Sequence, residues 1–141
     1  MSTAALPASL DRQVQKIARV RDPKQGYELL LFLAKKLPGI EEGDRIEENK
    51  VQGCVSQVFI NAELRDGAVY YRGDSDSQLT KGLAALLIQG LSGLEPKTIT
   101  ELEPDFIKQT KLNVSLTPSR ANGFYNIFKM MQGRAAQFID Q

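Results

Sequence analysis

The sequence contains no histidine and only one cysteine, Cys54. The missing histidine excludes Ser-His-Asp and Cys-His catalysis, histidine metal sites and imidazole acid–base chemistry. A single cysteine excludes an internal disulfide, a four-cysteine zinc site and an iron–sulfur cluster held by this chain alone. Most enzyme mechanisms are therefore ruled out, and the thiol of Cys54 is the main candidate for chemistry.

The charge balance and the hydropathy pattern argue against two classes of partner. Lysine and arginine total 18 and aspartate and glutamate total 17, a net charge of +1, whereas nucleic-acid binders usually carry a basic excess. The longest apolar run, 29–34, is far shorter than a membrane span. Residues 1–10 lack the basic segment and apolar block of a secretory signal. With its unpaired thiol, the protein is expected in a reducing cytoplasm, with neither nucleic acid nor membrane as partner.

The length of 141 residues, with 42% apolar and 25% charged residues, is ordinary for one globular domain. We predict a single domain over 1–141, with residues 1–9 as a flexible N-terminus. Apolar residues at helical spacing predict a first helix through Leu10, Val14 and Ile17. A second helix is predicted over 27–37, ending at Pro38-Gly39.

The middle of the chain has the pattern of a β-hairpin. The charged stretch 41–50 has no periodicity, and we expect at most one short edge strand there, around Ile46. Val58, Ile60, Ala62 and Leu64 then alternate with Gln57, Phe59, Asn61 and Glu63, and this period of two predicts a strand. Asp66-Gly67 is typical of a type I′ turn, and 69–72 then returns as the second strand.

The second half of the chain is predicted to be helical. Residues 73–76 are expected to form a turn and to supply the N-cap of a leucine-striped helix ending near Leu91. Gly82 lies within that stripe, which indicates close packing there. Short helical pieces follow around 99–102 and 105–112, and Thr117-Pro118 starts a last amphipathic helix. The predicted fold class is α+β, a small antiparallel sheet covered on one face by helices.

Cys54 allows two interpretations. A lone cysteine is most often a small buried hydrophobic residue. Gly53 before it, however, permits a sharp turn that would place the thiol at a loop tip, and Lys50 is a nearby cation that would lower the pKa of the thiol. The residues alone leave these interpretations equally supported.

Three blocks of sequence resemble one family in the same order along the chain. Residues 49–58 read Asn-Lys-Val-Gln-Gly-Cys-Val-Ser-Gln-Val, which closely resembles the cysteine loop of the SufE family. The resemblance continues through Gly-Asp-Ser-Asp at 73–76 and Lys81-Gly82, and through Leu-Thr-Pro-Ser-Arg at 116–120 followed by Gly123. Phe59 departs from the tryptophan of many members. The resemblance covers about 27–131 and implies a SufE/IscU-like fold.

This resemblance implies a covalent sulfur carrier that is not a stand-alone enzyme. A pyridoxal-phosphate cysteine desulfurase of the SufS type would hold sulfur as a persulfide, and Cys54 would take it and pass it to an iron–sulfur scaffold of the SufBCD type. The PLP belongs to the partner, so no cofactor and no metal is expected on this chain. The residues expected to support the sulfur loop and its cavity are Val51, Gly53, Val55, Ser56, Asp74 and Arg120. Lys50 and Lys81 are expected to face the partner.

Each supporting residue also has a purely structural interpretation. Asp74 and Asp76 could simply cap the following helix, and Arg120 could be solvated or could pair with Asp74 or the thiolate. An apolar shelter for the thiol, formed by Val51, Val55 and Val58, is expected to open when the partner docks. Two alternative functions are a thiol-based peroxidase or redox sensor, and an adaptor whose cysteine is only structural.

Overall fold

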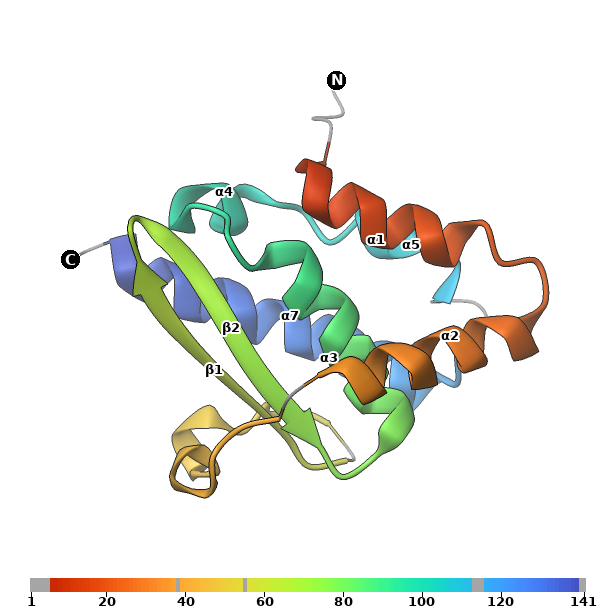
Figure 1. Ribbon diagram of the computed structural model, residues 1–141, viewed down its shortest axis with the longest axis horizontal. Coiled ribbons are helices and arrows are strands. Elements are labelled where there is room, and N and C mark those ends of the chain that lie inside the picture. The colour runs from red at the N-terminus through yellow and green to blue at the C-terminus, as the bar shows by residue number, and fades with distance from the viewer. Residues whose placement is uncertain (1–5, 38, 55, 113–115, 140–141) are drawn as a thin grey trace.

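The computed structural model describes residues 6–37, 39–54, 56–112 and 116–139. Its helices and strands, with two short 3-10 turns, follow one another as in Figure 1. They are α1 (Ala8–Ala18), α2 (Pro23–Lys36), η1 (Glu42–Asp44), η2 (Glu47–Asn49), β1 (Val58–Arg65), β2 (Ala68–Ser75), α3 (Gln78–Leu91), α4 (Pro96–Glu101), α5 (Phe106–Gln109) and α7 (Pro118–Ile139). This confirms the predicted α+β class.

The sheet is one antiparallel hairpin of β1 and β2. Asp66 and Gly67 both have positive φ, 51° and 80°, as a type I′ turn requires. The register pairs Val58 with Ser75 and Ile60 with Gly73, so the inward residues of both strands face the same side. Both paired positions are buried. The predicted hairpin is therefore confirmed.

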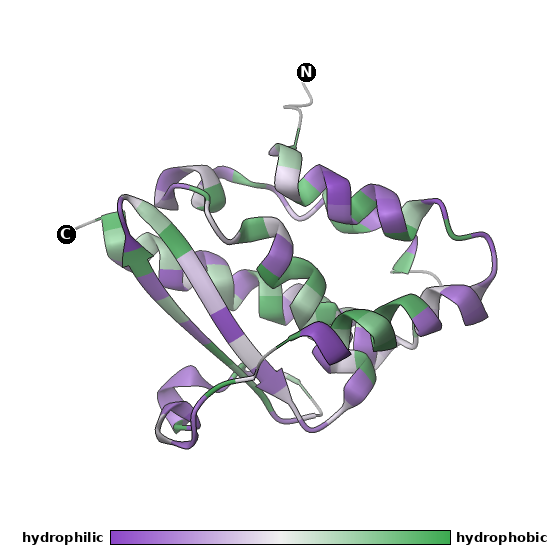
Figure 2. Ribbon diagram, viewed as in Figure 1, coloured by the Kyte–Doolittle hydropathy of each residue, from purple (hydrophilic) through white to green (hydrophobic). Residues whose placement is uncertain are grey.

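Helices α3 and α7 cover the inner face of this hairpin, as Figure 1 shows. Much of α3 is coloured hydrophobic in Figure 2, and the buried apolar residues of α3 and α7 belong to one core cluster with those of β1 and β2. The buried hydroxyl of Tyr71 on β2 donates to the carbonyl oxygen of Met131 on α7 at 2.6 Å, and burial raises the pKa of that phenol. Phe106 packs edge-on against Phe128, which joins α5 to α7.

Helix α3 is the central element, because α1, α2, α7 and β2 all pack around it. Gly82 lets α2 approach so closely that a Cβ at this position would collide with the backbone carbonyl of Leu30. Leu10 of α1 also lies close to Gly90, and the Ser9 hydroxyl donates to the Gly90 carbonyl oxygen at 2.7 Å. The close packing predicted at Gly82 is confirmed.

Three local predictions differ from the structure. No strand forms around Ile46; η1 and η2 flank it, because Asn49 donates its side-chain amide to the Asp44 carbonyl and closes this stretch on itself. Strand β2 continues through Ser75 where a turn was expected, and Ser77 is the N-cap of α3. Helix α1 already begins at Ala8, inside the stretch 1–9 predicted to be flexible, since Leu10 and Ser9 attach it to α3.

The last helix starts as predicted. The Thr117 hydroxyl accepts a hydrogen bond from the backbone N–H of Arg120 at 3.4 Å, and Pro118 is the first helical residue. The predicted helix end at Pro38 lies partly outside the described residues, and α2 ends at Lys36. Among the described helices, none is both long and apolar enough to cross a bilayer.

The contact at Gly82 predicts a large effect of one methyl group. Gly82→Ala should lower the free energy of unfolding by about 1–3 kcal/mol or more, because neither α2 nor α3 can move without disturbing the core. The matched control is Gly133→Ala on α7, where an added Cβ meets nothing within 4 Å; it should raise that free energy by roughly 0.5–1 kcal/mol. Urea unfolding measures both, and a neutral Gly82→Ala would contradict the packing.

Candidate functional site

The single cysteine lies on a loop that is tied at its base. The backbone N–H of Val51 donates to the carbonyl oxygen of Val58 at 2.8 Å, which closes the loop where β1 begins. The C-terminal end of the loop is held by two hydrogen bonds between Gln57 and Asp76. The Gln57 N–H donates to the Asp76 carboxylate at 3.0 Å, and the Asp76 N–H donates to the Gln57 carbonyl at 3.2 Å. The segment between these two ties, residues 52–56, is here called the cysteine loop.

Gly53 gives the cysteine loop its sharp turn. Its φ of +84° is in the left-handed region that glycine adopts without strain. The Asn126 side-chain amide of α7 donates to the Gly53 carbonyl at 3.1 Å, and a Cβ on Gly53 would lie only 2.7 Å from that amide nitrogen. The turn and the close approach of α7 both favour glycine, and Cys54 follows outside any strand. The predicted loop-tip position is confirmed.

The thiol of Cys54 faces the beginning of α7. Its Sγ lies 3.8 Å from the carbonyl oxygen of Gly123, to which the thiol donates. The side chain is half-buried, and this burial raises the pKa of Cys54 above its ordinary value. The prediction that Lys50 lowers this pKa is therefore wrong in direction. Lys50 lies on a separate groove, beside Gly53.

A small hollow of about 90 Å³ lies beside the sulfur. It is lined by Cys54, Ser56, Thr80, Ser119, Arg120 and Gly123. Thr80 and Gly123 are buried and form its inner wall, whereas Ser119 and Arg120 are exposed at its rim. The structure thus brings the first and third recognisable blocks of sequence together around the thiol.

The expected apolar shelter is different from this hollow. Val51 and Val58 are 3% and 0% exposed and belong to the main core, while Val55 lies outside the described residues. The hollow beside Cys54 has hydroxyl groups and a guanidinium among its lining residues. Val51 therefore supports the cysteine loop from the core and through its backbone hydrogen bond.

Asp74 is the centre of an ion-pair network next to the loop. Its carboxylate accepts from the Arg45 guanidinium and lies 3.1 Å from Lys81 Nζ. Partial burial acts to raise the pKa of Asp74, but the bonds from Arg45, the Ser75 N–H and Lys81 outweigh it and leave the pKa below the ordinary value. This network ties the segment before the cysteine loop to β2 and α3.

Three roles considered from the sequence are corrected by these contacts. Asp74 and Asp76 do not cap α3, because Ser77 does so and both carboxylates have the other partners described above. Arg120 does not pair with Asp74, whose two cations are Arg45 and Lys81. The Lys81 side chain, for which a partner contact stays a prediction, is 19% exposed and makes this ion pair.

Sequence reasoning missed Arg45, Asn126 and Arg134. Arg134 donates to the Glu48 carbonyl oxygen and to the Asn49 side chain, and so attaches η2 to α7. These polar residues come from a non-periodic charged segment and from the solvent side of a helix. No local pattern distinguishes them from other surface residues.

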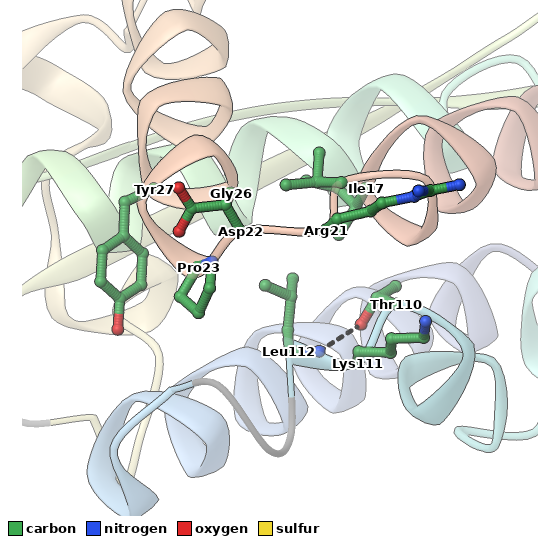
Figure 3. A pocket seen from close by; sticks show the side chains of 10 residues that line it. Ile17, Arg21, Asp22, Pro23, Gly26, Tyr27, Thr110, Lys111 and Leu112 are labelled. Carbon is green, nitrogen blue, oxygen red and sulfur yellow. Dashed lines mark hydrogen bonds between the residues drawn. The ribbon is translucent and has the colours of Figure 1, made fainter.

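Two further hollows lie away from the thiol. One groove runs between η2 and α7 and includes Lys50, Gln52 and Lys129. The other, of about 280 Å³, lies between the α1–α2 connection and the end of α5, where Ile17, Pro23 and Leu112 face one another (Figure 3). Neither contains the thiol, and the described residues contain no cluster of acidic and cysteine ligands suited to a metal ion.

The burial of Cys54 predicts a specific pH dependence. Because the pKa of the thiol is raised, its alkylation by iodoacetamide should show an inflection at higher pH in the native protein than in the same protein unfolded in urea. Alkylation rates followed by mass spectrometry across the alkaline range measure both inflections. An inflection in the native protein at or below that of the unfolded chain would contradict the described environment.

Removing the Asp74 charge should destabilise the protein at neutral pH. Asp74→Asn leaves Arg45 and Lys81 without their carboxylate and should cost on the order of 1–2 kcal/mol. The folded-state pKa is lowered from 3.8, so the stabilisation is complete above that value and is lost as the pH falls through the folded pKa. Urea unfolding of both proteins should therefore converge in acid. Asp105→Asn, at an exposed carboxylate, is the control.

Comparisons with known proteins agree with this arrangement. An uncharacterized SufE-like protein of Synechocystis is 62% identical over 138 residues, covering 98% of this chain and 87% of the relative. The cysteine desulfuration protein SufE of Plasmodium vivax is 37% identical over 115 residues, 79% of this chain and 46% of that protein. A solution structure of a hypothetical protein from Thermus thermophilus has the same fold, with a TM-score of 0.83 at 23% identity, covering 97% and 100% of the two chains.

The family model described as a SufE, Fe-S metabolism associated domain matches residues 11–135. This span includes the cysteine loop, the Asp74 network and all six residues of the hollow. The chain belongs to the SufE family.

Proposed function

We propose that this protein is a sulfur acceptor and carrier that works through Cys54. It takes sulfur from the persulfide of a PLP-dependent cysteine desulfurase of the SufS type, thereby stimulates that enzyme, and passes the sulfur to an iron–sulfur scaffold of the SufBCD type. The chain needs no cofactor of its own for this reaction, since the PLP acts in the desulfurase. A working thiol requires a reducing compartment, so we propose that the protein acts in the cytoplasm.

The transfer is a thiol–persulfide exchange. The Cys54 thiol first loses its proton, and the thiolate attacks the terminal sulfur of the desulfurase persulfide. A new S–S bond forms on Cys54 as the S–S bond in the desulfurase breaks, and the desulfurase cysteine leaves as a thiolate. The product is a Cys54 persulfide. Sulfur is moved without net oxidation or reduction of the pair of proteins.

The observation that carries this proposal is the place of the only thiol at a loop tip beside a hollow. The thiol at rest donates to the Gly123 carbonyl and is half-buried, so the protonated form is favoured in the free protein. Movement of the loop tip away from α7 would break the hydrogen bond to Gly123 and expose the thiol to solvent. Both changes would make the thiolate form easier to reach. Docking to the desulfurase is the event that we propose moves it.

The alternative of a thiol peroxidase is less well supported. Such an enzyme needs a thiolate at rest, stabilised by cations or by N–H donors. In this protein burial shifts the pKa of Cys54 in the opposite direction. The thiol also faces a carbonyl oxygen, which accepts from the protonated form and would repel the anion.

Mass spectrometry with a cysteine desulfurase tests the proposal. After incubation with a SufS-type desulfurase and L-cysteine, the intact protein should gain one sulfur that dithiothreitol removes, located on the peptide containing Cys54. Cys54→Ser should gain none and should not stimulate the desulfurase. Its thermal unfolding should stay close to that of the wild type, because the thiol makes one weak hydrogen bond.

Wild-type protein alkylated at Cys54 is the matched control, since it retains every other residue. It should fail in the same way as Cys54→Ser. Stimulation by Cys54→Ser equal to that of the wild type would refute a covalent relay. If the wild-type protein gains no sulfur, the experiment is repeated with a second desulfurase. A gain of sulfur then means that the first desulfurase was the wrong partner, and no gain means that the protein carries no sulfur.

A further inference from the structure

The inner wall of the hollow beside Cys54 contains a hydroxyl group that has no bonding partner among the described residues. Thr80 is 5% exposed, and its backbone N–H donates to the Ser77 hydroxyl. Within the described part of the chain, the Thr80 side-chain hydroxyl makes no hydrogen bond of its own, not even to the carbonyl one helical turn earlier, where helical threonines commonly bond. Because this hydroxyl has no partner and Thr80 lines the hollow, the hydroxyl is available to bind a ligand there.

The polar side chains around the hollow can donate as well, whereas the Gly123 carbonyl oxygen is an acceptor that faces the resting thiol. Ser56 and Ser119 supply hydroxyls, and Arg120 supplies a guanidinium. The hollow also lies at the first turn of the 22-residue helix α7, whose N-terminus carries a partial positive charge. Among the described residues that line the hollow, none carries a carboxylate. This combination favours a small anion next to the sulfur of Cys54.

We propose that the hollow is the binding site for the terminal sulfur of the Cys54 persulfide, held as the perthiolate anion with the Thr80 hydroxyl as a donor. This inference rests on the proposed function, because that reaction forms the persulfide. The second sulfur lies about 2 Å from Sγ. A water molecule needs roughly 10–15 Å³ of such a hollow, so a hollow of about 90 Å³ has room for one more sulfur atom.

The two states of Cys54 then have different partners in the same place. The resting thiol donates to the Gly123 carbonyl oxygen, whereas the persulfide presents an anion to Thr80, Ser56 and the rim. Hydrogen bonds to a charged form favour that form. A perthiolate accepts electrons less readily than a neutral perthiol, so the bound sulfur is protected from attack by small thiols until the loop tip moves. A bulky mixed disulfide would not fit in the same space.

The test compares Thr80→Val, which removes the hydroxyl and keeps the shape, with Thr80→Ser, which keeps the hydroxyl. Each protein is loaded with sulfur by the desulfurase and L-cysteine, separated from the desulfurase, and exposed to a small thiol. The rate of sulfur loss is measured on the loaded fraction of each protein, and loaded Thr80→Val should lose its sulfur about tenfold faster than the loaded wild type. Thr80→Ser should retain sulfur as the wild type does.

A spectroscopic readout separates this role from a merely structural one. The ultraviolet absorbance of the loaded protein, titrated with acid, should show the perthiol of Thr80→Val ionising at higher pH than in the wild type. Thr110→Val removes a buried hydroxyl that does not line the hollow, one that donates to the Ile107 carbonyl and accepts from the Leu112 N–H, and should leave retention and titration unchanged. Urea unfolding of all variants monitors the fold.

The outcomes distinguish the two proposals. If the wild type and Thr80→Val both load and then lose sulfur at equal rates, the site assigned to Thr80 is wrong while the relay stands. If the wild type takes up no sulfur from any desulfurase tested, the proposed function fails and this inference fails with it.

Discussion

The close approach of α2 to α3 at Gly82 is the constraint on which the arrangement of the site depends. Gly82 follows directly after Thr80 and Lys81. Contact with the Leu30 backbone fixes the position of this turn of α3. Lys81 can then reach Asp74, and Thr80 can line the hollow beside Cys54. A packing requirement in the core thereby sets the geometry of a surface loop about 30 residues away in the chain.

Helix α7 supplies the opposite side of the site. Its first turns contact the thiol through Gly123, and its next turn bonds to the tip through Asn126. Farther along, Arg134 holds η2 and Tyr71 donates to Met131. One helix thus positions the cysteine loop, the segment before it and the sheet. The thiol lies beside the first turns of α3 and α7, near the start of β1.

The sequence predicted those features that depend on short-range patterns. The hairpin follows from a period of two in the first strand and a turn that demands positive φ, and the last helix follows from Thr117-Pro118. The glycines at 53 and 82 also indicated a turn and a close contact. Arg45, by contrast, could not be predicted, because its partner Asp74 is 29 residues away and its own segment has no periodicity. The end of β2 was misjudged because Gly-Asp-Ser-Asp has the composition of a turn, while tertiary pairing with Val58 keeps it extended.

The anchoring of the cysteine loop also determines how often its tip leaves the protein surface. The base is closed by backbone bonds, whereas the described bonds that hold the tip are those from Asn126 to Gly53 and from Cys54 to Gly123. Two bonds with a net value of about 0.5–1.5 kcal/mol each correspond to an excited state populated by between roughly one molecule in six and one in 160. A partner that captures this minor state binds more weakly by the same factor. Stronger contacts at the loop tip would therefore protect the thiol and, by the same factor, reduce the population of molecules in which a partner can reach it.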